Sequence, residues 1–252
     1  MSFSQRHIEA VFCGCLLACL GCGGGSDVGE RAVNKDGGAP GYAIQREQMV
    51  RDQLLTRDIH DPRVLKAMRQ VQRHLFVPVN EAPYAYEDRP LPIGDGQTIS
   101  QPYIVALMSQ LLELQGGEKV LEVGTGSGYQ AAVLAALDAH VFSIEIICQL
   151  ADRARERLHD LGIMNVNVRC GDGYRGWPEA VPFDAIIVTA APDHVPPPLI
   201  EQLKDGGRLV IPVGEYHQEL VLIRKEGTRT IERKITPVRF VPMTGEVEER
   251  PR

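Results

Sequence analysis

The feature that most constrains this chain is a strand-like segment that runs directly into three closely spaced glycines. Residues 119–130 read KVLEVGTGSGYQ, and a helix of small apolar residues is expected from Ala131 to Leu137. A strand, a glycine turn and a helix in this order are typical of a doubly wound α/β sheet, which binds nucleoside-like ligands at the carboxyl ends of its strands. Glycine is favoured at such a turn because the backbone lies against the ligand. We therefore expect Gly124, Gly126 and Gly128 to contact a cofactor.

An acidic residue supports a nucleoside site. Residues 139–145 predict the next strand, and this strand ends at Glu145. Glu145 lies roughly 20 residues beyond the first glycine, which is the spacing at which an acid meets ribose hydroxyls. A carboxylate can accept one hydrogen bond from each hydroxyl of a vicinal diol. The alternative is that Glu145 is an ordinary surface residue at a strand end.

The pattern beyond Glu145 predicts the fold class. Apolar strand-like runs alternate with helical ones, and strand-like segments continue to about residue 243. This order predicts a doubly wound, Rossmann-like, mostly parallel sheet, with helices before it and antiparallel strands at the C-terminal end. The net charge of −6 and the lack of a basic stripe disfavour a nucleic-acid partner. We expect a monomer.

The N-terminal part of the chain differs in composition from the rest. Residues 1–22 resemble a secretory or lipoprotein leader, because a short apolar run ends in Leu16-Leu17-Ala18-Cys19 and Cys22 follows. The run is too short to span a bilayer. Residues 23–43 are glycine-rich and polar and predict a disordered linker. Residues 44–252 then form one domain.

The six cysteines predict no metal site. Cys19 and Cys22 have the spacing of a metal or redox pair, but no second ligand pair accompanies them. Cys148 and Cys170 are isolated in the body of the chain.

Four stretches together resemble the protein-L-isoaspartate O-methyltransferases, within the class I S-adenosylmethionine (AdoMet) methyltransferases. The glycine spacing G-x-G-x-G, with Glu122 two positions ahead, resembles the first motif of that class, whereas a dinucleotide site has G-x-G-x-x-G. The other stretches are RPLPIG with QTISQP within residues 89–102, GDGYRGWP at 171–178, and residues 183–192 with 206–214. The QTISQP stretch is the most specific to the family. It lies in a long proline- and glycine-rich loop, residues 85–102, which we expect to lack regular structure.

The resemblance implies an activity and a set of site residues. The activity is methyl transfer from AdoMet to the α-carboxylate of L-isoaspartyl residues in damaged proteins and peptides, which starts their repair to aspartyl. Ser100 is the implied active-site residue and Thr98 is a second candidate hydroxyl, while residues 239–242 are expected to border the peptide groove. The implied cofactor residues are Glu122, Gly124, Gly126, Gly128, Glu145, Asp172, Gly173 and Thr189. Asp172 is expected to bind the adenine amino group.

Several alternatives compete with these assignments. Ser100 could be only the N-cap of the helix that follows it, and Asp172 could be only a turn residue. The enzyme could be an AdoMet methyltransferase with another carboxylate or small-molecule acceptor. A nicotinamide oxidoreductase is a further alternative, but it would need a wider glycine spacing. A surface-anchored binding protein with an inactive fold is another, but it would not need both Glu122 and Glu145.

The leader leaves two locations open. A cytoplasmic location is favoured, because AdoMet is made in the cytosol. Export as a lipoprotein through residues 10–22 is the alternative, and membrane contact is expected only if this leader is lipidated.

Overall fold

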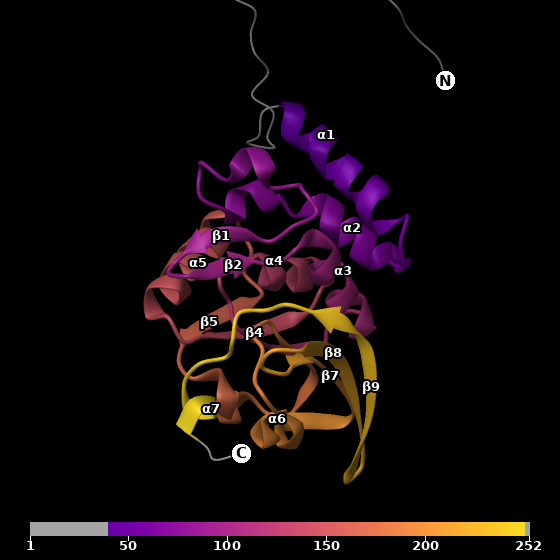
Figure 1. Cartoon of the computed structure of the whole chain (residues 1–252), viewed down its shortest axis with the longest axis vertical. Helices are drawn as coiled ribbons and strands as arrows, with labels where there is room; N and C mark the ends of the chain where they lie inside the picture. The colour runs from indigo at the N-terminus through magenta and orange to yellow at the C-terminus, as the bar shows by residue number, and fades with distance from the viewer. Residues whose placement is uncertain (1–39, 250–252) are drawn as a thin grey trace, which may run out of the picture. The chain divides into compact units, whose positions relative to one another are not determined.

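The structure is a computed structural model and describes residues 40–249. Within these residues, seven strands form one sheet (Figure 1). The strands are β3 (Lys119–Val123), β4 (His140–Glu145), β5 (Val166–Cys170), β6 (Phe183–Val188), β7 (Leu203–Val213), β8 (Gln218–Glu226) and β9 (Arg229–Val238). Their spatial order is β5-β4-β3-β6-β7-β8-β9. The five strands from β5 to β7 are parallel, whereas β8 and β9 are antiparallel to their neighbours. The predicted fold class is confirmed.

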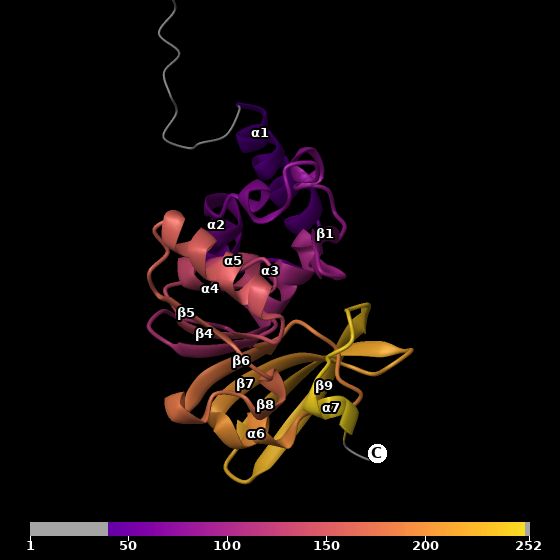
Figure 2. The ribbon, with the colours of Figure 1, turned by 90° about the vertical axis from the view of Figure 1, so that its left-hand side faces the viewer.

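Helices cover both faces of this sheet. They are α1 (Pro40–Gln48), the π-helical turn η1 (Met49–Leu54), α2 (Pro62–Gln70), α3 (Pro102–Leu111), α4 (Tyr129–Ala136), α5 (Cys148–Asp160), α6 (Pro197–Gln202) and α7 (Glu246–Glu249). Short 3₁₀ turns are η2 (Arg73–Phe76), η3 (Ala82–Tyr84), η4 (Gly173–Arg175) and η5 (Pro178–Ala180). Figure 2 shows α2, α3, α4 and α5 on one side of the sheet and α6 on the other.

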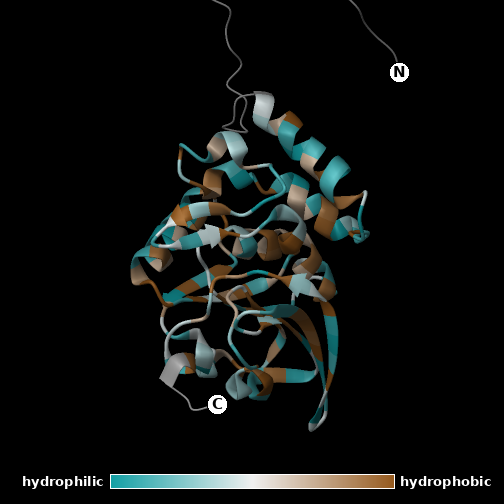
Figure 3. Ribbon diagram, viewed as in Figure 1, coloured by the Kyte–Doolittle hydropathy of each residue, from teal (hydrophilic) through white to brown (hydrophobic). Residues whose placement is uncertain are grey.

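The central strands are apolar because both of their faces are buried. Along β6, Ala185 and Ile187 pack into the core on the side of α2 to α5, whereas Ile186 and Val188 pack into the second core with α6. This alternation follows from the two-residue period of a strand. Figure 3 shows the hydrophobic colour along these strands and a mainly hydrophilic α1.

The N-terminal helices begin earlier than the sequence predicts. The linker was expected to reach residue 43, but α1 starts at Pro40, since proline suits the first turn of a helix. Asp61 caps α2, because its carboxylate accepts hydrogen bonds from Arg63 N at 2.8 Å and Val64 N at 3.4 Å. Residues 1–39, with the leader and the Cys19–Cys22 pair, lie outside the described residues.

The stretch expected to lack regular structure contains a small hairpin. Strands β1 (Leu91–Gly94) and β2 (Gln97–Ile99) pair in an antiparallel manner, and β2 leads through Ser100 into α3. The turn between them has positive φ at Gly94, Asp95 and Gly96. Strands of three and four residues are too short to give a periodic sequence signal. The hairpin fixes the position of Thr98 and Ser100 relative to the sheet.

The two cysteines of the domain are bonded to each other. Cys148 and Cys170 form a disulfide with Cα atoms 4.9 Å apart. The two residues lie close together because the parallel pairing of β4 with β5 places Cys170 beside Glu145, and α5 starts at Cys148 just after Glu145.

Within residues 40–249, no helix is both long and apolar enough to cross a membrane. No group of three or more His, Cys, Asp or Glu side chains there could hold a metal ion.

Candidate active site

The glycine loop lies where the sheet changes direction of winding. Strand β3 has β4 on one side and β6 on the other, and a cavity opens at the carboxyl ends of these three strands. Ligands of open α/β sheets bind at this switch point. Gly124 and Gly126 line the cavity and have φ values of +97° and +52°. A Cβ at Gly124 would overlap the hydroxyl of Thr189, so this position requires glycine.

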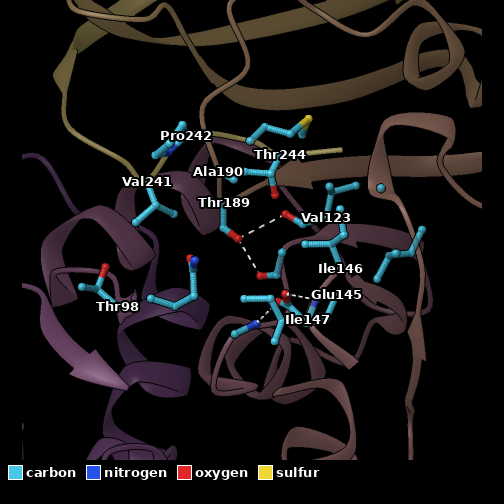
Figure 4. Close-up of a pocket in the computed structure, with 16 residues that line it drawn as sticks. Thr98, Val123, Glu145, Ile146, Ile147, Thr189, Ala190, Val241, Pro242 and Thr244 are labelled. Atoms are coloured by element: carbon cyan, nitrogen blue, oxygen red, sulfur yellow. Dashed lines mark hydrogen bonds between the residues drawn. The ribbon is translucent and has the colours of Figure 1, made fainter. Parts of the chain in front are cut away.

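Glu145 is held in the cavity wall by two backbone amides (Figure 4). Its Oε2 accepts a hydrogen bond from Gly126 N at 2.8 Å, and its Oε1 accepts one from Ile147 N at 3.0 Å. The side chain is 6% exposed and lines the cavity at the end of β4. Each oxygen keeps a further lone pair, so the carboxylate can still accept from a diol. The position fits the predicted role of Glu145 toward a ribose.

Thr189 connects the glycine loop to the end of β6. Its hydroxyl donates to Gly124 O at 2.6 Å, with a longer contact to Val123 O at 3.1 Å. Thr189 lines the cavity, as predicted, and also lines the neighbouring groove described below.

Gly128 lies away from the cavity. It is the N-cap residue of α4 with φ of +88°, and a Cβ there would meet Leu158 and Ala154 of α5. It is absent from the residues that line the cofactor cavity. The structure therefore gives Gly128 a role in the turn and in helix packing, whereas its predicted cofactor contact stays a prediction.

Glu122 is buried beneath the glycine loop, outside the cavity lining. Its side chain is fully buried and accepts a hydrogen bond from the Ser143 hydroxyl, which in turn contacts the Thr125 hydroxyl at 2.5 Å. Burial raises the pKa of the Glu122 carboxyl to about 8, and the Ser143 hydrogen bond opposes this only in part. Glu122 is thus placed to support Thr125 of the glycine loop from below.

Asp172 and Gly173 follow β5 and differ in their placement. Gly173 lines the cavity, and a Cβ there would overlap Val123. The Asp172 carboxylate accepts from Tyr174 N at 2.9 Å and from Glu246 N at 2.7 Å, and it does not line the cavity. It ties the C-terminal segment to the end of β5. The contact of Asp172 with an adenine amino group stays a prediction.

Other residues of the cavity wall were not predicted from the sequence. Ile146 and Ile147 follow Glu145 directly, and Ile146 is 40% exposed, which is unusual for an apolar residue and gives a flat ring a surface to lie on. In the sequence, two apolar residues directly after an acid at a strand end could have indicated this part of the cavity wall. Met243 and Thr244 of the C-terminal segment also line the cavity. Two backbone hydrogen bonds of 2.8 Å hold this segment beside the end of β6, one from Ala191 N to Val241 O and one from Met243 N to Ala191 O.

A groove of about 690 Å³ adjoins the cavity. The residues that line it include Ser100 and Gln101, the threonines Thr98 and Thr189, and the segment 237–242. Thr98 and Thr189 line both spaces, as do Val241 and Pro242, so the groove and the cavity meet at these four residues.

The segment 239–242 follows β9 and is held by a side-chain amide. Gln218 donates from Nε2 to Phe240 O at 3.1 Å and accepts at Oε1 from Phe240 N at 2.6 Å. Among the described residues that line the groove, only Arg239 is charged. The position of this segment agrees with its expected place beside the peptide groove.

Ser100 lies in the groove and is not the N-cap of α3. The cap residue is Gln101, and no side-chain hydrogen bond caps this helix. Within residues 40–249, the structure gives the Ser100 hydroxyl no hydrogen-bond partner, although the side chain lines the groove. The capping alternative therefore fails. A hydroxyl without an intramolecular partner can donate to a bound carboxylate.

The sheet and the cavity define a class of protein. The glycine loop leaves room for a ligand, the Glu145 carboxylate faces the space, and an apolar surface lies beside it. These features fit the nucleoside part of AdoMet. A seven-stranded sheet of this order with such a loop and strand-end acid is that of a class I AdoMet methyltransferase.

Comparison with known proteins identifies the family within this class. The model of the protein-L-isoaspartate(D-aspartate) O-methyltransferase family matches residues 44–248. A protein-L-isoaspartate O-methyltransferase 2 of Shewanella sediminis is 60% identical over 206 residues, which cover 81% of this chain and 84% of the relative. The chain belongs to the protein-L-isoaspartate O-methyltransferase family.

Two solved structures support the same assignment. A protein-L-isoaspartate O-methyltransferase aligns with a TM-score of 0.73 at 33% identity, over 80% of this chain and 67% of the other. A Plasmodium falciparum protein assigned to the same family aligns with a TM-score of 0.70 at 27% identity, over 79% of this chain and 98% of the other. The Plasmodium falciparum protein was solved in complex with S-adenosyl-L-homocysteine.

Proposed function

We infer that this chain is an AdoMet-dependent methyltransferase that esterifies the α-carboxylate of L-isoaspartyl residues in damaged proteins and peptides. The observation that carries this function is the junction at Thr98 and Thr189, where the cofactor cavity opens into the groove that contains Ser100. A carboxylate in that groove is close to a methyl donor in the cavity. The ester that forms closes spontaneously to a succinimide, and hydrolysis of the succinimide returns part of the material to aspartate.

AdoMet supplies an activated methyl group on a sulfonium, which is a good leaving group. The residues proposed to hold it are Gly124, Gly126 and Glu145, together with Gly173 and Thr189. Glu122 and Asp172 would act indirectly, since the first supports the glycine loop and the second fixes the chain segments around Gly173.

The acceptor needs no general base. A carboxylate with a pKa of about 4 is ionised at neutral pH and is already a nucleophile. The protein has to remove water from the carboxylate and align one oxygen with the methyl carbon. Ser100 donates one hydrogen bond to the carboxylate, with Thr98 as a second donor. Neutral donors suit this task, because a closely paired cation would stabilise the ground state of the carboxylate.

Transfer of a labelled methyl group to matched peptides tests the proposed function. One peptide contains isoaspartate and the other contains aspartate in the same sequence. The isoaspartyl peptide is expected to be methylated and the aspartyl peptide is not. Equal methylation of both would favour an enzyme with another carboxylate acceptor, and a small-molecule screen would then follow.

We propose that the enzyme acts as a monomer in the cytoplasm, where AdoMet is made. The Cys148–Cys170 disulfide favours the alternative of export through residues 10–22, because disulfides persist mainly in oxidising compartments. The intact mass of the protein from its native host decides between the two. An unmodified chain beginning at Met1 supports the cytoplasm, whereas lipid on Cys19 or Cys22 supports export.

A further inference from the structure

The Cys148–Cys170 disulfide joins two chain segments that border the cofactor cavity. Cys148 is the first residue of α5 and directly follows Ile146 and Ile147, which line the cavity. Cys170 is the last residue of β5 and the register partner of Glu145 in β4. The bond therefore links the segment after Glu145 to the segment that leads to Gly173 (Figure 4 shows Glu145, Ile146 and Ile147).

This bond adds a covalent link to a part of the cavity wall that hydrogen bonds also hold. On one side, Ile147 N donates to the Glu145 carboxylate at 3.0 Å. On the other side, Gly171 N donates to Glu145 O at 2.9 Å. Both hydrogen bonds end on Glu145, and the disulfide is the covalent link between the two segments. Without it, Ile146 and Ile147 have more conformations to lose when a ligand binds.

Both cysteine residues are exposed, so a thiol reagent can reach them. In the exchange, a thiolate of a dithiol reductant attacks one sulfur, breaks the S–S bond and forms a mixed disulfide. The second thiol of the reductant then displaces the protein sulfur. The protein gains two electrons and two protons as Cys148 and Cys170 become thiols, and the reductant becomes a cyclic disulfide.

We propose that Cys148 and Cys170 form a reversible thiol–disulfide couple that sets the affinity for the cofactor, with the disulfide form binding more tightly. The proposal rests on the proposed function for the identity of the cofactor. In a reducing cytoplasm the couple rests as two thiols and closes under oxidation, whereas in an exported protein it rests as the disulfide. Cofactor affinity thereby follows the redox state of the compartment.

The test uses the full-length chain and S-adenosyl-L-homocysteine as the probe. Its dissociation constant is measured by calorimetry in an oxidising glutathione buffer and in excess dithiothreitol. Alkylation and peptide mapping report the state of Cys148 and Cys170 in each sample. Reduction is expected to weaken binding by about 3- to 10-fold, the effect of about one or two additional side chains that must be ordered.

The variant Cys148→Ser/Cys170→Ser is the matched control, and thermal melting checks its fold. It keeps the four leader cysteines, so an effect that arises from them would persist. The double variant is expected to bind like the reduced wild-type protein in both buffers. Equal affinity of the oxidised and reduced wild type, free thiols in the oxidising buffer, or a redox effect that persists in the variant would each overturn the proposal. Probe binding without methyl transfer to an isoaspartyl peptide in either buffer would instead overturn the proposed function.

Discussion

The Thr189 hydroxyl donates a hydrogen bond to the carbonyl oxygen of Gly124 at 2.6 Å, and this contact joins the ends of β6 and β3. It depends on glycine, because a Cβ at position 124 would overlap the hydroxyl. Thr189 lines both the cavity and the groove that contains Ser100. One side chain thus contacts the glycine loop and borders the place where we propose that methyl donor and acceptor meet.

Thr189→Val is expected to weaken cofactor binding by about 1 kcal/mol, since it keeps the shape of the side chain but removes the hydrogen bond to Gly124. Calorimetry with S-adenosyl-L-homocysteine measures the change. Thr189→Ser retains a hydroxyl and is the matched control. If Thr189→Val keeps the wild-type affinity and Thr189→Ser loses it, the methyl group and not the hydroxyl is what matters.

Glu145→Ala is expected to weaken AdoMet binding by about 2–3 kcal/mol, because charge-assisted hydrogen bonds to the ribose are lost. Glu145→Gln keeps one acceptor oxygen for Gly126 N or Ile147 N and is expected to lose less. The affinity of each variant is compared with its melting temperature, since the two amides also stabilise the loop. Wild-type affinity in a folded Glu145→Ala protein would refute the ribose assignment.

Ser100→Ala is expected to lower kcat/KM for an isoaspartyl peptide by about 10- to 100-fold, or about 1.4–2.8 kcal/mol, for the loss of one positioning hydrogen bond. AdoMet affinity and melting temperature should stay at the wild-type values, because Ser100 neither lines the cofactor cavity nor caps α3. Ser100→Thr retains the hydroxyl and should recover part of the rate. Full activity of Ser100→Ala would remove Ser100 from the active site.

The buried Glu122 carboxyl predicts how stability depends on pH. Its pKa is about 8 in the folded protein and near 4.5 when exposed in the unfolded chain. The folded state therefore binds more protons between these values, and the free energy of unfolding falls as pH rises across this window. The contribution is at most about 1.4 kcal/mol per pH unit.

Glu122→Gln removes this titration while keeping an acceptor for the Ser143 hydroxyl. Urea unfolding of both proteins between pH 5 and pH 8 is expected to show the variant gaining stability relative to the wild type as pH rises. Parallel pH profiles would mean that Glu122 is ionised in the folded protein, contrary to the effect of its burial.

Much of the fold could be predicted from the sequence because the buried strands are continuous apolar runs. Strand β6 is apolar on both faces. The three glycines after β3 mark the tight turn between this strand and helix α4. The hairpin of β1 and β2 could not be predicted in this way, since its register depends on a turn in which Asp95 has a positive φ.

The site could be predicted in part. Gly124, Gly126, Glu145 and Thr189 lie in the cavity lining as expected. The side-chain directions of Glu122 and Asp172 could not be predicted, because they depend on which face of a strand end points to the ligand. The disulfide partner of Cys148 depends on strand order, which residue spacing does not report.

The most direct test of the central claim follows one isoaspartyl peptide over time with enzyme and AdoMet, separating the products by chromatography and mass spectrometry. The methyl ester is expected to appear first and the succinimide to follow, while the aspartyl peptide accumulates and the starting peptide declines. The same peptide without enzyme is the control. A starting peptide that remains unmethylated, while the enzyme binds AdoMet, would contradict the proposed methylation of isoaspartyl residues.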